Sequence, residues 1–329
     1  MTSTTVPIPV LPRHAPTLRD ELRPIDLLDC SVEELCELAV ETGEPAYRGE
    51  QLAHWLYKIG AVELSQMTNL PSNLRRALAE KGRIGDATVI ESVRTSNGDT
   101  EKALLRNADG ATIETVLMRQ RATDGGLRNT VCLSSQVGCA VGCPFCATGQ
   151  AGWFRNLTAG EIVAQVLLWS RRLAPFGEKV HNLVYMGMGE PLGNYDAVWK
   201  SINILNDRRA FGLGARHITV STSGIAPRIE RLAHEGLQIN LAVSLHAPDN
   251  ALRDELVPLN RQYPIERLLA ACERYIAITN RRVSFEYVLL SGVNDSPEQA
   301  RSLAHLVDRL LCHVNLIPLN PEPTSRFQA

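Results

Sequence analysis

The sequence has few aromatic residues, almost no net charge and no long apolar run. Phe, Trp and Tyr together make up 5% of its 329 residues, and the formal net charge is -2. This near-neutral balance gives no global sign of nucleic-acid binding, so any such affinity must come from local basic patches. No apolar run reaches the length that spans a membrane, and residues 1–19 lack the apolar core of a signal peptide. We therefore predict no membrane partner.

Cysteine is also sparse for a protein held together by disulfides. The eight cysteines are diluted in a long chain, and three of them are bunched together. Small secreted proteins with disulfide scaffolds carry a much higher density of cysteine. The distribution favours a reducing, cytoplasmic environment, and the chain length allows one to three domains.

The three bunched cysteines are the most informative feature. Cys139, Cys143 and Cys146 follow the spacing C-x3-C-x2-C, and Phe145 precedes the third. Zinc sites usually draw four ligands from two pairs, whereas three thiolates on one loop suit a [4Fe–4S] cluster with one iron left open. An open iron can hold S-adenosylmethionine (SAM), and reduction of that complex yields a radical. A zinc knuckle or three unrelated thiols are the alternatives.

Four regions differ in their periodicity. The first has four prolines and little apolar periodicity, the second has apolar residues at helical spacing, the third alternates like strands, and the fourth alternates strands with helices. We predict a flexible tail, a helical accessory domain, a β-strand extension and an α/β domain. Their ranges are 1–23, 24–82, 83–124 and 125–329.

The last region predicts a curled parallel sheet. Strands are expected at residues 130–134, 181–186, 217–221, 239–245, 283–289 and 314–318. Strands that alternate with helices pair in parallel through right-handed crossovers. An open doubly wound sheet is the alternative. A (βα)6 partial TIM barrel fits better, because polar motifs follow the strands and barrel enzymes build their sites from those loops.

Several polar residues follow these strands. Gly189 would let the backbone approach a ligand, and Glu190 offers a carboxylate to an ammonium group. Ser221 could bond a carboxylate or ribose, although a simple helix cap is an equal alternative. A lone histidine is more often structural, yet His246 falls at the active face of the predicted barrel. Asn320 could bond a nucleobase or shape a turn.

Long motifs in this order resemble the RlmN/Cfr family of radical-SAM RNA methyltransferases. They cover residues 43–48, 67–70, 132–149, 155–158, 186–192, 221–224 and 244–248, and the similarity runs from about Leu27 to Pro321. The resemblance implies a partial barrel of the radical-SAM type. It also implies methylation of adenosine C2 in 23S rRNA and tRNA. Methylation of C8, as in the Cfr branch, is the alternative, and residues 136–138 look more like the C2 branch.

The resemblance assigns roles to individual residues. It makes Cys139, Cys143 and Cys146 the ligands of the [4Fe–4S] cluster. It makes Glu114 the proton acceptor and Cys132 the cysteine that resolves a covalent RNA–enzyme intermediate. The implied SAM-binding residues are Gly189, Glu190, Ser221, Ser244, Leu245, His246 and Asn320. Without the resemblance, Cys132 would be interpreted as a small buried strand residue and Glu114 as a solvent-facing carboxylate.

In that family one SAM first methylates a cysteine, and a second SAM yields a radical that takes hydrogen from the methyl group. The carbon radical adds to adenine, a base removes the ring proton, and a second cysteine releases the product as a disulfide forms. No cysteine follows Pro321 to match the methyl carrier. We therefore expect a fragment or shortened homologue that binds the cluster, SAM and RNA and cleaves SAM without methyl transfer.

The resemblance also implies partners. These are 23S rRNA, tRNA and an electron donor such as flavodoxin or ferredoxin, and we expect a monomer. Arg75, Arg76 and Lys81 of the helical domain are a candidate RNA surface, together with Arg155. The remaining alternatives are a catalytically incomplete RNA-binding protein and a radical-SAM enzyme of other specificity.

Overall fold

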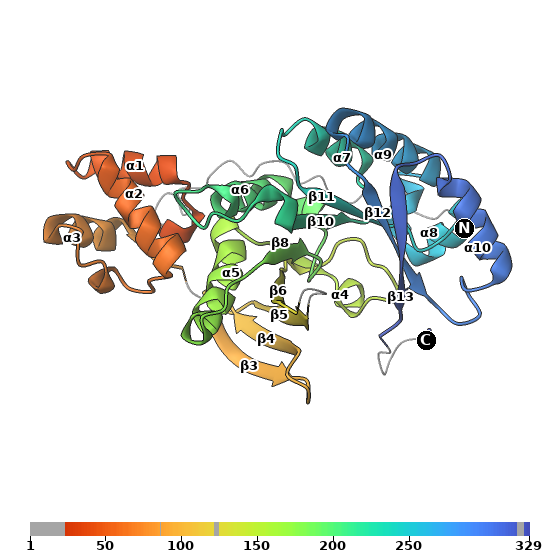
Figure 1. The fold of residues 1–329 in the computed structure, drawn as a ribbon, viewed down its shortest axis with the longest axis horizontal. Helices are drawn as coiled ribbons and strands as arrows, with labels where there is room; N and C mark the ends of the chain where they lie inside the picture. Colours follow the sequence, from red (N-terminus) through yellow and green to blue (C-terminus); the bar gives the residue numbers. More distant parts are fainter. Residues whose placement is uncertain (1–23, 86, 122–124, 321–325) are drawn as a thin grey trace.

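A computed structural model describes residues 24–85, 87–121, 125–320 and 326–329. The flexible tail expected over residues 1–23 lies outside this range. Figure 1 shows a small helical region at one side, a curved sheet covered by helices, and a pair of strands that extends from the sheet edge.

In the helical region, the segments that come just before and just after the helices pair with each other. Its helices are α1 (Val32–Glu41), α2 (Tyr47–Ala53), which continues into a π-helical turn (His54–Ile59), and α3 (Ser72–Lys81). The capping box expected at Ser31 is present, since its Oγ accepts from the Glu34 amide at 3.2 Å and Glu34 accepts from the Ser31 amide at 2.7 Å. A two-residue strand, β1 (Ile25–Asp26), pairs in parallel with β2 (Gly82–Arg83). The chain therefore enters and leaves this region at one place.

Six parallel strands form the body of the protein, and their neighbours follow chain order. The order in the large sheet is β13-β12-β11-β10-β9-β6-β5-β4-β3. The parallel strands are β6 (Leu127–Cys132), β9 (Asn182–Tyr185), β10 (Ile218–Thr222), β11 (Asn240–Ser244), β12 (Val283–Leu289) and β13 (Cys312–Pro318). Right-handed crossovers that always step in one direction place every helix on the same face, and the sheet then curls. The partial barrel is confirmed, and the doubly wound alternative is wrong.

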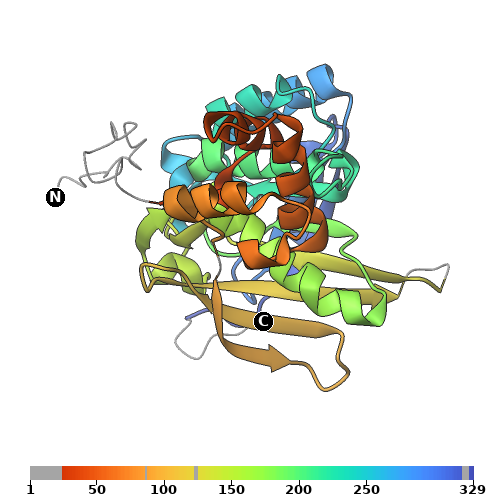
Figure 2. The same cartoon turned by 90° about the vertical axis from the view of Figure 1, so that its left-hand side faces the viewer.

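The β-extension continues this sheet. Its strands are β3 (Thr88–Arg94), β4 (Thr100–Arg106) and β5 (Thr112–Arg121). Strand β4 pairs antiparallel with both β3 and β5, and β5 pairs antiparallel with β6. Figure 2 shows them along the lower edge of the molecule, with the helical region in front of the barrel. Because β5 is hydrogen-bonded to β6, side chains of the extension reach the edge of the barrel.

The outer face of the barrel is covered by helices. They are α5 (Ala159–Leu173), α6 (Tyr195–Asn206), α7 (Ala226–Ala233), α8 (Asn250–Leu256), α9 (Ile265–Thr279) and α10 (Pro297–Val307). The capping boxes expected at Thr158 and Ser296 both form. The short helix α8 was not predicted, because only the longer apolar pattern after it suggested a helix. No helix in the described ranges is both long and apolar enough to cross a membrane.

The helical region and the barrel share one apolar core. The Gly160 amide, at the start of α5, donates to Asp29 Oδ1 at 2.7 Å. A Cβ at Gly160 would lie 2.9 Å from the Asp29 amide nitrogen, so only glycine allows this approach. Leu27 and Trp169 are fully buried in this shared core. The helical region is thus fixed against the outside of the barrel through α5.

Candidate functional site

A small β-hairpin carries the cysteine loop. Strand β7 (Gln136–Gly138) pairs antiparallel with β8 (Trp153–Asn156), and the Cys139 amide donates to the carbonyl oxygen of Gly152 at 2.9 Å. Gly138 has a φ of +76°, and a Cβ there would overlap that carbonyl oxygen. Glycine is therefore required where the loop closes. This hairpin was not predicted from the sequence.

The three cysteines lie between β7 and the short helix α4 (Ala147–Gln150), and all are partly buried free thiols. The Cys146 amide donates to the Cys143 carbonyl at 3.1 Å, which turns the chain between them. Burial raises the thiol pKa of Cys139 to about 12, and it also raises the pKa of Cys143, where charges on Cys139 and Cys146 add to the effect. Bound iron must therefore displace protons from these thiols.

This arrangement fits a cluster better than a single ion. Across the ranges that the structure covers, no three His, Cys, Asp or Glu side chains converge closely enough to hold one metal ion. Structural zinc needs four such ligands around one point. In a [4Fe–4S] cluster each thiolate binds a different iron, so the thiols must be spread apart on one loop.

The loop after β9 is fitted against the cysteine hairpin. Gly189 has a φ of +102°, and a Cβ there would lie 2.6 Å from the Gln136 Cβ. The Glu190 amide donates to Gln136 Oε1 at 2.8 Å. Gln136 was not predicted as a site residue, and it connects the cysteine hairpin to the candidate SAM-binding loop.

The Glu190 carboxylate is buried at the junction of two strand ends. Its Oε2 accepts from the Ser223 amide at 2.6 Å, and its Oε1 accepts from the Leu192 amide at 3.0 Å. Burial raises the pKa of this carboxyl, although these hydrogen bonds oppose the shift. A buried carboxylate of this kind is suited to a cationic ligand.

His246 follows β11 in a strained conformation. Its φ is +59°, which is uncommon for a residue other than glycine. Its Nδ1 accepts from the Val288 amide at 3.0 Å, and Asn294 donates to its carbonyl oxygen at 2.9 Å. Burial and the charge of Arg253 lower its pKa to about 3, so the ring is neutral and carries its proton on Nε2. The Phe145 ring meets it edge-on at 5.1 Å, which joins the cysteine loop to β11.

The other candidate SAM-binding residues also lie at carboxyl ends of strands. Ser221 pairs with Ala242 one residue before β10 ends, and Ser244 ends β11. Leu245 is fully buried, so only its backbone could contact a ligand, and its amide donates to the Glu286 carbonyl at 3.0 Å. Asn320 is exposed two residues beyond β13. The structure therefore gathers these residues at one edge of the barrel.

Glu114 and Cys132 lie on neighbouring strands at the same edge. Cys132 is paired with Val116 across β5 and β6, and burial raises its thiol pKa to about 12. Glu114 is partly exposed and forms an ion pair with Lys102 at 2.8 Å. Its amide lies 3.3 Å from Met188 Sδ in the β9 loop. All eight cysteines are free thiols, so the disulfide expected for the family chemistry is not formed in this structure.

Arg253, which is fully buried in α8, was missed from the sequence. Its guanidinium lies behind the strand ends and interacts electrostatically with Cys143. A buried cation beside the cysteine loop suits an anionic group such as a thiolate-bound cluster. Charged residues are rarely buried, so nothing in the pattern of residues 250–256 could have placed it there.

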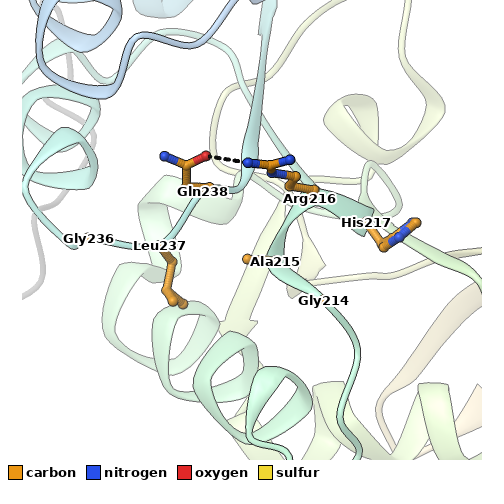
Figure 3. A pocket seen from close by; sticks show the side chains of 7 residues that line it. All are labelled: Gly214, Ala215, Arg216, His217, Gly236, Leu237 and Gln238. Atoms are coloured by element: carbon orange, nitrogen blue, oxygen red, sulfur yellow. Dashed lines mark hydrogen bonds between the residues drawn. The ribbon is translucent and has the colours of Figure 1, made fainter.

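An open hollow occurs at the opposite edge of the sheet (Figure 3). It is lined by residues 214–217 before β10 and 236–238 before β11, and Arg216 donates to Gln238 across it at 3.4 Å. None of the candidate cluster, SAM or catalytic residues lines it. We assign the functional site from the chemistry at the carboxyl ends of the strands, because this hollow brings together no such set of groups.

Comparison with known proteins identifies the family of this chain. Residues 133–304 match the family model of the radical SAM superfamily, and residues 25–84 match that of the ribosomal RNA large subunit methyltransferase N-terminal domain. A probable dual-specificity RNA methyltransferase RlmN from Moorella thermoacetica is 50% identical, over 92% of this chain and 86% of its own length. The protein of the same name from Chloroflexus aurantiacus is 53% identical, over 90% and 80%.

A solved structure is equally similar. The crystal structure of a radical SAM methyltransferase from Sphaerobacter thermophilus superposes with a TM-score of 0.88 at 53% identity. The match covers 92% of this chain and 88% of that one. Fold and site together therefore define a radical-SAM enzyme, whose cofactors are a [4Fe–4S] cluster and SAM. Within that superfamily the chain belongs to the RlmN family of methyltransferases.

Proposed function

We propose that this protein methylates C2 of adenosine in 23S rRNA and tRNA, and that it does so in the cytoplasm. The observation that carries the proposal is the meeting of two sets of groups at one barrel edge. The cysteine loop and the buried Glu190 stand on one side, and Glu114 and Cys132 stand on the adjoining strands. The named relatives are RNA methyltransferases, which supports RNA as the substrate.

Cys139, Cys143 and Cys146 are the proposed cluster ligands. When bound, the cluster and SAM supply a carbon-centred radical that can attack a carbon that is not nucleophilic. The position of all three thiols on one short loop and the buried Arg253 behind the strand ends both support this assignment.

The proposed SAM site uses the strand ends. Glu190 would accept a hydrogen bond from the amino group of SAM, since its carboxylate is buried and held in place by two backbone amides. His246 would donate from Nε2, because its Nδ1 is already used by Val288. The remaining contacts are assigned to Gly189, Ser221, Ser244, Asn320 and the backbone of Leu245.

The RNA side of the site holds the proton acceptor. Glu114 would accept the C2 proton of adenine at a carboxylate oxygen, and Lys102 keeps that carboxylate on the sheet surface. Cys132 Sγ would attack the sulfur of the methyl-carrying cysteine, so that a disulfide forms, the bond from that sulfur to the carbon on adenine breaks, and this carbon takes up a proton. No residue from Pro321 to Ala329 of this sequence is that second cysteine. Because burial holds the thiol pKa of Cys132 at about 12, the thiol must lose its proton to a base before the sulfur can attack.

The target adenosine must leave its stack to reach this edge, as base-modifying enzymes require. We assign residues 24–82 to RNA binding, with Arg76 on α3 as a candidate contact. Arg155 is a weaker candidate, because Asp109 and Glu161 already pair with its guanidinium at 2.6 and 2.8 Å. A flavodoxin or ferredoxin as electron donor and a monomeric state complete the proposal.

The test is anaerobic reconstitution with iron and sulfide, followed by reaction with SAM, a reductant and an RNA fragment. Mass spectrometry of digested RNA then reads the product. 2-Methyladenosine supports the proposal, and 8-methyladenosine supports the C8 alternative. Formation of 5′-deoxyadenosine with unmodified RNA supports the alternative of a chain that cleaves SAM but transfers no methyl group.

A Glu114→Gln variant is the matched control for the RNA side. It should bind iron and cleave SAM as the wild type does, because Glu114 belongs to the β-extension rather than to the cysteine loop. Loss of iron uptake in this variant would contradict the assignment of Glu114 to the RNA step.

A further inference from the structure

Arg253 is a buried cation whose hydrogen bonds to the described residues all go to neutral acceptors. Its side chain is fully buried. Nε donates to the Leu245 carbonyl at 3.1 Å, one terminal nitrogen donates to Asn260 Oδ1 at 2.9 Å, and the other donates to the carbonyls of Ser223 at 2.7 Å and Ser244 at 3.0 Å. Within the described part of the chain, no carboxylate forms an ion pair with it.

Such a group costs free energy unless a negative charge lies nearby. A buried ion loses the solvation of water, and hydrogen bonds to carbonyls recover only part of it. The Asp254 carboxylate also acts on the guanidinium, but Asn260 separates them: its Oδ1 accepts from Arg253 and its Nδ2 donates to Asp254. The cysteine loop reaches the other side, where Arg253 holds the carbonyls of Ser223, Ser244 and Leu245. The contact of Phe145 with His246 places that loop directly over the strand end whose carbonyls Arg253 binds.

We propose that Arg253 is a positioning residue that balances the negative charge of the cluster and fixes the ends of β10 and β11 beneath it. The inference rests on the proposed assignment of the cluster to Cys139, Cys143 and Cys146. Three thiolates outweigh the positive charge of an oxidised [4Fe–4S] core, and reduction adds a further electron. A buried cation next to that assembly therefore stabilises the reduced form more than the oxidised form.

The hydrogen bonds of Arg253 give it a second effect on the same site. Ser223 donates its amide to Glu190 and accepts from Arg253 at its carbonyl. The cation and the carboxylate thus hold one residue from opposite sides, and Arg253 also holds the carbonyls of Ser244 and Leu245. Loss of the Arg253 guanidinium should therefore make the loop that carries Glu190 less rigid.

The reduction potential of the cluster tests whether the positive charge of Arg253 stabilises the reduced form. Arg253→Met and Arg253→Lys both remove the planar guanidinium group, but only the lysine variant keeps the positive charge. In a redox titration followed by electron paramagnetic resonance, Arg253→Met should shift the reduction equilibrium at least tenfold toward the oxidised cluster, which is about 59 mV for one electron. Arg253→Lys should shift it by less than half of that. An unchanged potential in Arg253→Met, or equal shifts in both variants, overturns the proposal.

Arg281→Met is the matched control, because Arg281 lies before β12 at the opposite end of the strands and donates to Asn240. Its potential should equal that of the wild type. If Arg253→Met does not fold, Arg253→Gln serves instead, since it is neutral but keeps amide donors for the carbonyls that Arg253 holds. That variant should also lower the potential, and an unchanged value contradicts the proposal.

Failure of this inference differs from failure of the proposed function. If the wild type takes up no iron, the cluster assignment itself is wrong. If it forms a normal cluster and cleaves SAM, while all variants keep the same potential, only the role of Arg253 is wrong.

Discussion

The two ends of the parallel strands carry polar residues for different purposes. At the amino ends, polar side chains pair within the chain: Arg281 donates to Asn240, and Asn129 donates to Glu178 at 2.9 Å. The Asn129 amide donates to His181 at 3.1 Å, His217 meets Asn182 at 3.0 Å, and Asn240 donates to the Arg216 carbonyl at 2.9 Å. These bonds join neighbouring strands near the start of the parallel sheet, and they are made within the chain.

At the carboxyl ends, the chain instead holds buried charges and strained backbone. Glu190 and Arg253 are buried ions, and His246 has a φ of +59°. Buried charges and strained residues persist only where the surrounding structure or a ligand compensates them. The two ends therefore differ in kind: hydrogen bonds within the chain join the strands at the amino ends, whereas the carboxyl ends are arranged around groups that bind there.

The largest expected difference between the carboxyl and amino ends of the strands is in iron uptake. Cys143→Ala should abolish iron uptake and SAM cleavage, because three thiolates are needed for one cluster. Wild type should take up about four irons per chain. Iron and sulfide assays after anaerobic reconstitution measure this.

Cys272→Ala is the control, because Cys272 is fully buried in α9 and is not part of the cysteine loop. It should keep its iron. Equal loss of iron in both variants would show that iron uptake does not depend specifically on the cysteine loop, which would contradict the prediction.

The next effect is a pH dependence of stability in the iron-free chain. His246 has a folded pKa of about 3, below its ordinary value of 6.5, because burial disfavours its charged form. As pH falls below 6.5 the unfolded chain binds a proton that the folded chain does not, so the free energy of unfolding falls until about pH 3. The contribution is at most about 1.4 kcal/mol per pH unit.

His246→Asn should remove this contribution, since asparagine does not titrate and tolerates a positive φ. Urea denaturation at several pH values between about 3 and 6.5 measures the slope for both proteins. Gln238→Asn in the hollow at the amino ends is the control, because it changes no titratable group, and it should keep the wild-type slope. Parallel pH profiles for His246→Asn and the wild type would contradict the prediction.

A smaller difference should separate two glycines that both have positive φ. Gly189 has a φ of +102° and Gly236, at the amino end, has a φ of +77°. Alanine should cost each about 1–2 kcal/mol of backbone free energy. Gly189→Ala should cost more and should weaken SAM binding, because its Cβ would meet Gln136, whereas nothing lies within 4 Å at Gly236.

Denaturation curves and equilibrium dialysis with SAM compare the two variants. Equal losses of SAM affinity for Gly189→Ala and Gly236→Ala would argue that the β9 loop has no special part in binding.

The smallest effect is expected in the hollow of Figure 3. His217 is exposed there. His217→Ala should change the free energy of unfolding by no more than about 0.5 kcal/mol and leave SAM cleavage unchanged. A tenfold loss of SAM cleavage would mean that the amino ends contribute to function.

Much of the fold could be predicted from local signals. The capping boxes at Ser31, Thr158 and Ser296 mark helix starts through bonds made within four residues, so the sequence alone specifies them. The hairpin of β7 and β8 was missed, because β7 and β8 are only three and four residues long and long-range pairing decides whether they form. The short helix α8 was missed for a similar reason.

For the candidate site, the sequence by itself determined which chemistry is available. The spacing of Cys139, Cys143 and Cys146 and the motif at Glu190 are local, so the printed residues are enough to identify them. Only the tertiary structure decided that Phe145 meets His246, that Gln136 binds the Glu190 amide, and that Arg253 is buried behind the strand ends. These contacts join residues from separate strands and loops. Their energies depend on burial and distance, which the curl of the sheet sets and the order of residues does not reveal.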